Sequence, residues 1–166
     1  MLKEIIVDEQ DNPIGAKSWD ERTYDDIYRV SAVWLTDLSG TYCLLTQRKH
    51  TKTNDPGKWM MAASGTVEED ETYDSNIVKE IAEEIGLTGI ELKKCEKVFQ
   101  DDGKNKFFVQ FYSGVVDMKT AKVVIQEEEV EQYMWIEISE LLKWLQDRPE
   151  DFVPSMKRSL EAVGAI

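Results

Sequence analysis

The spacing of apolar residues divides the chain into strand-like and helix-like segments. Runs rich in Val, Ile, Trp, Tyr and Phe, bounded by turn-forming residues, predict β-strands. We expect these strands at residues 4–7, 14–17, 28–35, 41–46, 92–100, 107–116 and 130–136, with residues 59–63 leading into a loop. Apolar residues at helical spacing predict helices at residues 74–85, 139–145 and 154–163. The mixture predicts an α+β protein in which helices pack on a sheet of several antiparallel strands.

The segment from 74 to 85 carries the clearest helical pattern. At about 100° per residue, its apolar side chains cover an arc of about 140°. These residues are Ile77, Val78, Ile81, Ala82 and Ile85. Such a stripe predicts a helix face that packs on the core. Thr72 or Asp74 can cap the start of the helix, and Gly86 suits a left-handed residue at its end.

Three glutamates, Glu80, Glu83 and Glu84, share a second arc of about 100° beside the apolar stripe. Carboxylates three and four residues apart repel one another on an isolated helix. A hard divalent cation would offset this repulsion, since Mg²⁺ is typically held by carboxylates together with substrate phosphates. A solvated acidic helix face is the alternative interpretation in a chain this rich in acids.

Composition favours one soluble globular domain over residues 1–166. The chain has a formal net charge of −13, with 42% hydrophobic and 32% charged residues. It has no apolar run as long as a membrane span, and its first residues lack the apolar segment of a signal peptide. The two cysteines, Cys43 and Cys95, are expected to be reduced thiols of a cytoplasmic protein.

The acidic charge is concentrated in one segment. Eight acids and one base between Gly65 and Leu87 give that segment a net charge of −7, whereas residues 46–58 carry +3. Such a surface disfavours nucleic acid and anionic membranes. It can still bind an anionic diphosphate if cations intervene. We therefore expect a small-molecule partner, with no nucleic acid and no membrane.

Residues 65–87 resemble the Nudix box, whose pattern is G-x5-E-x7-R-E-U-x-E-E-x-G-U with U an aliphatic residue. Eight of its nine fixed positions match, namely Gly65, Glu71, Glu80, Ile81, Glu83, Glu84, Gly86 and Leu87. Lys79 stands where the pattern has arginine. The resemblance implies the Nudix fold, an α/β/α sandwich with a central mixed β-sheet and the box as a loop and helix. It also implies hydrolysis of a diphosphate linked to some other group.

The resemblance assigns metal ligands and a base. Glu80, Glu83 and Glu84, with the backbone carbonyl of Ser64, would bind Mg²⁺, for which Mn²⁺ is a substitute. In many Nudix hydrolases a glutamate six residues before a strand tryptophan reaches the metal as ligand or base, and Glu129 holds that position. Glu129 or a box glutamate such as Glu83 would take the proton of water. A charged loop that caps the last strand is the alternative interpretation of Glu129.

The remaining matches imply structural support. Glu71 tends to pair with the arginine of the box and to hold the loop against the helix. Lys79 could make that pair, but as a point charge and not as a planar fork. Gly65 would mark a tight loop where the backbone approaches the metal, and Gly86 would end the helix.

The order of segments around the box is similar to one Nudix branch, which includes isopentenyl diphosphate isomerase and its hydrolase relatives. Arg48 and Lys52, before Pro56-Gly57-x-Trp59, are similar to the diphosphate-binding pair of that isomerase. An arginine can grip a phosphate with two hydrogen bonds, and a lysine adds a point charge. Ordinary surface charge is the alternative interpretation of both residues.

The isomerase hypothesis does not match the residues at its own catalytic positions. Ser64 falls at the position of the isomerase's catalytic cysteine, and Thr66 at that of a metal-binding histidine. The positions of two further carboxylates of the isomerase fall near Lys106 and Phe108 in this chain. His50 is the only histidine in the chain. An isomerase must move protons on an unactivated alkene, whereas a hydrolase needs metals, a base and water.

We therefore predict a Mg²⁺-dependent hydrolase that cleaves a nucleoside-diphosphate-linked or other diphosphate substrate. Two alternatives stay open: an isomerase-like enzyme for an isoprenoid diphosphate, and a non-catalytic sensor of nucleotides or diphosphates. The group attached to the diphosphate, and the choice between monomer and homodimer, are not determined by these motifs.

Overall fold

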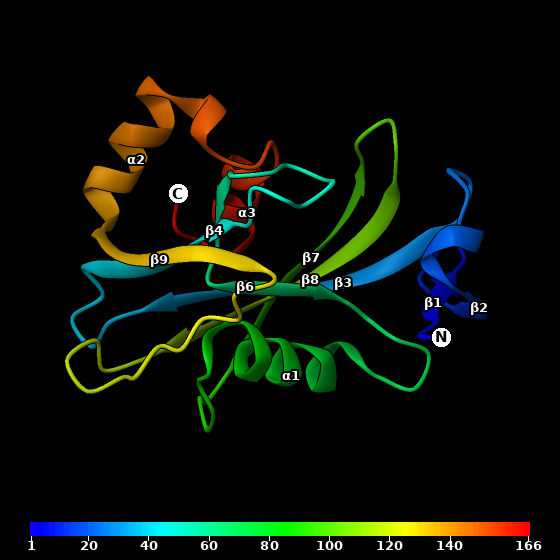
Figure 1. Cartoon of the computed structure of the whole chain (residues 1–166), viewed down its shortest axis with the longest axis horizontal. Helices are drawn as coiled ribbons and strands as arrows, with labels where there is room; N and C mark the ends of the chain where they lie inside the picture. The colour runs from blue at the N-terminus through cyan, green and yellow to red at the C-terminus, as the bar shows by residue number, and fades with distance from the viewer.

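The computed structural model describes residues 1–166 and contains a nine-stranded mixed sheet with three α-helices (Figure 1). The strands are β1 (Glu4–Val7), β2 (Pro13–Lys17), β3 (Ile27–Thr36), β4 (Tyr42–Arg48), β5 (Trp59–Met60), β6 (Ala63–Thr66), β7 (Lys93–Asp101), β8 (Lys106–Val115) and β9 (Val130–Glu137). The helices are α1 (Tyr73–Ile85), α2 (Ile138–Asp147) and α3 (Met156–Ala162), with short 3-10 turns at Trp19–Glu21 and Pro149–Asp151.

Strand β3 organises the sheet. It pairs in parallel with β8 along its whole length, from Ile27 opposite Lys106 to Thr36 opposite Val115. Three antiparallel strands share its other edge: β1 at the start, β6 in the middle and β4 at the end. Only one residue pair joins β3 to β4, whereas β4 pairs along most of its length with β9. Strands β3 and β4 therefore separate beside β6, and the loop between β6 and α1 begins at the place where they separate.

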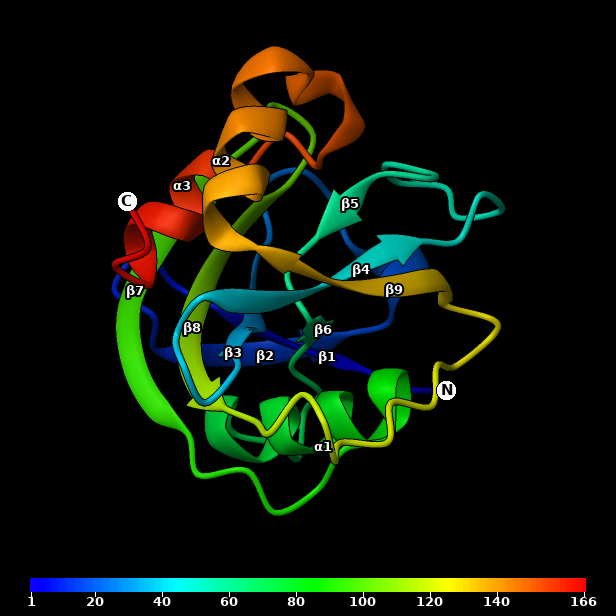
Figure 2. The ribbon, with the colours of Figure 1, turned by 90° about the vertical axis from the view of Figure 1, so that its left-hand side faces the viewer.

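Helices cover both faces of the sheet (Figure 2). Because side chains alternate along a strand, Val33 of β3 packs towards α1 while its neighbour Trp34 packs on the opposite face. The core on the α1 side includes Val33, Leu35, Leu44, Ile77, Ile81 and Ile85. The core on the α2 and α3 side includes Ala32, Trp34, Phe111, Leu141, Phe152 and Leu160. The arrangement confirms the predicted α/β/α sandwich. None of the helices is long and apolar enough to cross a membrane.

The buried face of α1 differs from the predicted stripe. Ile77, Ile81 and Ile85 are buried as expected, but Val78 is 58% exposed. Asn76 is fully buried, and Glu80 and Glu84 are only partly exposed. At about 100° per residue, the helix is thus rotated so that its acidic edge, and not Val78, lies against the sheet. The predicted stripe was wrong at Val78, because helical spacing alone does not show which edge of the stripe turns towards the sheet.

Two further expectations need correction. Gly65 lies inside strand β6 and not in a tight loop. The last helix begins at Met156 and not at residue 154, because Pro154 and Ser155 form a turn. Phe152 forms a bridge with Trp59, and the Val153 N–H donates to the Trp59 carbonyl at 3.0 Å. This contact attaches the C-terminal segment to the strand before the box.

Candidate active site

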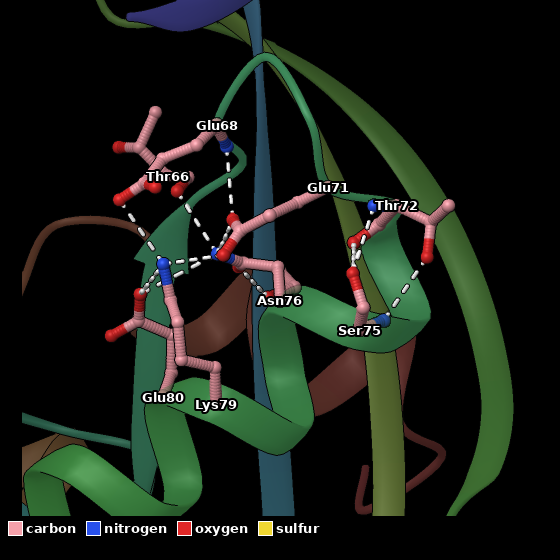
Figure 3. Close-up of polar contacts among 9 residues, drawn as sticks. Thr66, Glu68, Glu71, Thr72, Ser75, Asn76, Lys79 and Glu80 are labelled. Atoms are coloured by element: carbon pink, nitrogen blue, oxygen red, sulfur yellow. Dashed lines mark hydrogen bonds and ion pairs between the residues drawn. The ribbon is translucent and has the colours of Figure 1, made fainter. Parts of the chain in front are cut away.

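The loop and helix of the box are fixed at both ends of α1. The Ser75 N–H donates to Thr72 Oγ1 at 3.1 Å, and the Thr72 N–H donates to Ser75 Oγ at 2.9 Å (Figure 3). These reciprocal bonds satisfy N–H groups that a helix start leaves free. At the other end Gly86 has a φ of 69°, in the left-handed region. Capping by Thr72 and termination by Gly86 agree with the sequence prediction.

Lys79 binds the loop to the helix. Its Nζ lies 2.5 Å from Glu71 and 3.1 Å from Glu68, both in the loop, and 4.0 Å from Glu80 (Figure 3). Burial alone would lower the pKa of Lys79, but its hydrogen bonds to Glu71 and Glu68 outweigh that effect and raise it. The lysine therefore stays charged and makes the Glu71 contact for which the Nudix pattern uses arginine.

Asn76 is a supporting residue that the sequence analysis missed. Its amide nitrogen donates to the Thr66 carbonyl at 3.0 Å and to Glu71 at 2.8 Å, and it lies 3.4 Å from Glu80 (Figure 3). Its amide oxygen accepts a 2.5 Å hydrogen bond from Ser31 on β3. The asparagine thus joins sheet, loop and helix behind the acids. The sequence does carry a signal for this role: Asn76 is a polar residue four positions before Glu80, which places both on the same side of the helix.

The carboxylates of α1 lie directly beneath strand β6. A Cβ added to Gly65 would collide with the carboxyl group of Glu80, so only glycine permits this approach. One turn further along, the carboxylate of Glu84 accepts the Ser64 N–H at 3.2 Å. The glycine of the box is therefore required by close packing of Glu80 on the strand, and not by an unusual backbone angle.

Both of these carboxyl groups resist ionisation. Burial raises the pKa of Glu84 to about 8, and repulsion from Glu80 adds to the rise. Burial also raises the pKa of Glu80 to about 7; the charge of Lys79 opposes this and that of Glu83 adds to it. Both carboxyls therefore stay protonated to a higher pH than usual, and a cation bound beside them would favour their ionised forms. Glu83, by contrast, is exposed on the same helix.

Two charged residues outside the box influence Glu84. The charge of Glu129 raises the pKa of Glu84, and that of Arg48 lowers it, so both lie within electrostatic reach. Nε of Arg48 donates to the Asn54 carbonyl at 2.9 Å. Lys52 does not point into open solvent, because its Nζ lies 2.5 Å from the carboxylate of Glu129.

The donor atoms fit a hard divalent cation. Carboxylate and backbone oxygens are the ligands that Mg²⁺ and Mn²⁺ prefer. Glu80 and Glu84 supply two carboxylates beside Ser64, and Glu129 faces them. No three acidic, histidine or cysteine side chains lie close enough together to form a ready metal cluster. The side chain of Glu129 would have to leave Lys52 to complete one.

A cavity of about 470 Å³ is lined by both Arg48 and Ser64, and the Ser64 N–H donates to the carboxylate of Glu84. Its apolar lining comes mainly from β3, β8 and the segment leading into α3, and includes Val30, Ala32, Met61, Val109, Phe111, Val153 and Met156. The charged residues that line it, apart from Arg48, lie in loops: Asp55, Asp102 and Lys104. The cavity is thus apolar where strands β3 and β8 line it and polar where loops line it. No local pattern in the sequence predicts it.

These features define the Nudix class: an α/β/α sandwich, and a box made of a strand that contains glycine, a loop and an acidic helix, which lies where the sheet divides. The family model described as NUDIX domain matches residues 27–158. The chain therefore belongs to the Nudix family, and as an enzyme it is a pyrophosphohydrolase.

Known proteins agree with this assignment. An uncharacterised Nudix hydrolase of Pseudomonas aeruginosa is 31% identical over 131 residues, which cover 78% of this chain and 75% of that protein. A prenyl-diphosphate phosphatase of Methanosarcina mazei is 27% identical over 162 residues, or 96% and 92% of the two chains. Isopentenyl-diphosphate isomerases, such as that of Burkholderia multivorans at 26% identity, are also relatives. A crystal structure from Deinococcus radiodurans shares the fold with a TM-score of 0.80 at 16% identity, covering 96% of this chain and 98% of that one.

Proposed function

We propose that this protein hydrolyses a diphosphate linkage with Mg²⁺, or Mn²⁺ in its place, bound by Glu80, Glu84 and the Ser64 carbonyl. The observation that carries the proposal is the close approach of two carboxyl groups to β6: Glu80 packs against Gly65, and Glu84 accepts the Ser64 N–H at 3.2 Å. Two ionised carboxylates that lie this close repel each other near neutral pH, and a bound cation would offset that repulsion. Glu83, being exposed, would contribute through its charge or through a water ligand.

The side chains around the acids then have distinct tasks. The bound cation would polarise the diphosphate and lower the pKa of the attacking water. Arg48 would hold phosphate oxygens with its planar fork, and Lys52 would add a point charge. Glu129 or Glu83 would accept the proton of the attacking water.

Two substrate classes are candidates. The first is a nucleoside diphosphate linked to another group, as the box implies. The second is a prenyl diphosphate, and two observations favour it: the relative named prenyl-diphosphate phosphatase, and the cavity beside Arg48. A base or a ribose needs hydrogen-bonding partners in its pocket, since unpaired polar groups are costly when buried. The sheet side of the cavity offers mostly hydrocarbon surface, which suits a chain of isoprene units.

An isomerase is disfavoured by the side chains present. Ser64 and Thr66 cannot supply the thiolate and imidazole that the isomerase uses at these positions. His50 is 65% exposed and its Nδ1 lies 3.1 Å from Glu131, in a surface loop. A non-catalytic sensor is disfavoured by the retained acids of α1. We further propose that the chain is one domain over residues 1–166, works in the cytoplasm as a monomer or homodimer, and binds neither nucleic acid nor membrane.

A substrate panel tests these alternatives. Purified protein with Mg²⁺ is offered nucleoside diphosphate sugars, ADP-ribose, and isopentenyl, geranyl and farnesyl diphosphates, and phosphate is measured with and without added phosphatase. We expect the highest kcat/KM with a prenyl diphosphate; a nucleotide as the best substrate would select the first class. Binding of Mn²⁺ and diphosphate without any turnover would favour the sensor.

A variant of the cavity gives a second test. Ala32 is buried on β3 and lines the cavity. Ala32→Leu should lower kcat/KM for farnesyl diphosphate more than for isopentenyl diphosphate, because a longer chain must pass over the added atoms. Thermal melting checks that the variant folds. An equal loss for both substrates would show that the prenyl chain does not lie along this strand.

A further inference from the structure

Two loops beside the acids are joined by charge. Lys52 lies 2.5 Å from Glu129, and Lys49 lies 3.7 Å from Glu131. The Lys49 N–H donates to the Glu129 carbonyl at 3.0 Å, and His50 contacts Glu131. The loop after β4 is therefore held against the start of β9 and the loop before it by two separate ionic contacts. Only the first of these, between Lys52 and Glu129, involves residues with a proposed role in catalysis or substrate binding.

The contact between Lys52 and Glu129 joins two groups that cannot both act while it persists. An ammonium bound to a carboxylate is not free to bind a phosphate, and that carboxylate is not free to bind a cation or accept a proton. The loop that carries Glu129 nevertheless lies against the end of α1, since the Gln126 N–H donates to the Glu84 carbonyl at 3.0 Å. The charge of Glu129 also reaches Glu84.

We propose that Lys52 is an exchange residue that couples cation binding to diphosphate binding. Its ion pair with Glu129 neutralises that carboxylate. When a divalent cation binds at Glu80 and Glu84, Glu129 turns to the cation and releases Lys52 towards the incoming diphosphate. The inference rests on the proposed function and adds an order of events to it: the cation binds first, and its binding creates the positive charge that receives the substrate.

The size of the coupling follows from the exposure of the pair. The side chains of Lys52 and Glu129 are 30% and 40% exposed. Ion pairs of this kind typically contribute little, equivalent to about a 1.5-fold to 5-fold change in a binding constant. Competition by Lys52 should therefore weaken cation binding by a factor in that range. Because linkage is reciprocal, a diphosphate that captures Lys52 should strengthen cation binding by the same factor.

The test is a double-mutant cycle on cation binding, measured without substrate. Binding of Mn²⁺ is followed by electron paramagnetic resonance of the free ion for wild type, Lys52→Met, Glu129→Gln and the double variant. Removing any nearby positive charge strengthens cation binding, so Lys49→Met, from the same loop, is the matched control. Circular dichroism and thermal melting confirm that each variant is folded.

The expected result is specific to the pair. Lys52→Met should bind Mn²⁺ about 2-fold to 5-fold more tightly than Lys49→Met, and this gain should vanish when Glu129 is also replaced. Equal gains in the two lysine variants, a gain that persists in the Glu129→Gln background, or weaker binding by Lys52→Met would each overturn the exchange. A wild-type protein that binds no Mn²⁺ would overturn both the exchange and the proposed function.

Discussion

Replacing Glu84 by glutamine separates the cost of burying a carboxylate from its use as a ligand. The pKa of Glu84 is raised from an ordinary 4.5 to about 8, chiefly by burial. The folded state therefore holds this proton more tightly than the unfolded state does. Between about pH 4.5 and pH 8 the unfolded chain binds fewer protons, so the free energy of unfolding falls as the pH rises. Below this window both states are protonated and the cost disappears.

The magnitude is bounded by the same values. A rise from 4.5 to about 8 corresponds to at most about 5 kcal/mol at pH 8. Glu80 and Glu84 influence each other's ionisation, so the rise does not belong to Glu84 alone and the full value should not be realised. We expect Glu84→Gln to stabilise the cation-free protein by about 1–2 kcal/mol, which is a rise in Tm of about 2–8 °C for a chain of this size.

The assay is thermal melting with chelator at pH 5 and pH 8, and again with Mg²⁺. Glu84→Gln should melt above wild type at pH 8 in chelator, and most of the difference should disappear at pH 5. Mg²⁺ should stabilise wild type more than the variant, and the variant should lose most of its activity. Glu69→Gln, at an exposed loop position, is the control for removal of one acid. An unchanged or lower Tm for Glu84→Gln at pH 8 in chelator would refute the argument from burial and repulsion.

Other changes in the box have equally defined outcomes. Gly65→Ala should cost about 1–3 kcal/mol and most of the turnover, because its Cβ would displace the Glu80 carboxyl, whereas Gly15→Ala, with nothing within 4 Å of the added Cβ, should melt as wild type does. Lys79→Arg should be tolerated or raise activity, and Lys79→Met should cost about 2 kcal/mol by removing the cation that pairs with Glu71. A large loss of turnover in the arginine variant would show that the loop has repacked around lysine. No allylic isomer should form from isopentenyl diphosphate with Mg²⁺, Mn²⁺ or Zn²⁺ when followed by NMR, and hydrolysis in heavy-oxygen water should label only a phosphate-containing product; isomer formation above a Glu84→Gln control would restore the isomerase hypothesis.

Features that depend on neighbouring residues could be predicted from the sequence. The limits of α1 follow from a local capping pair at Thr72 and a glycine at position 86, and the hairpin of β1 and β2 follows from its turn residues. The rotation of α1 could not be predicted in the same way, since it depends on what the helix packs against. The acids lie beneath β6 because Gly65 makes room for them, and Val78 is exposed as a result.

Features that depend on distant residues were beyond a single sequence. Lys52 and Glu129 are 77 positions apart, and neither carries a local signal of the other. The cavity likewise arises from β3, β8 and the segment before α3, which come together only in the folded sheet. The resemblance to the family could single out Lys52 and Glu129, but only the folded structure shows that they form an ion pair.

The apolar lining of the cavity has a consequence for how this enzyme could change its substrate. Ala32, Met61, Val109, Phe111 and Met156 belong to the core cluster that holds α2 and α3 against the sheet. A mutation that reshapes the pocket at these positions also alters the packing on which folding depends. Variation that spares the fold is confined to the loops at the polar end, around Asp55 and Lys104. Evolution or engineering should therefore adjust the outer end of the substrate readily, while a switch in its inner part would require compensating stabilisation elsewhere.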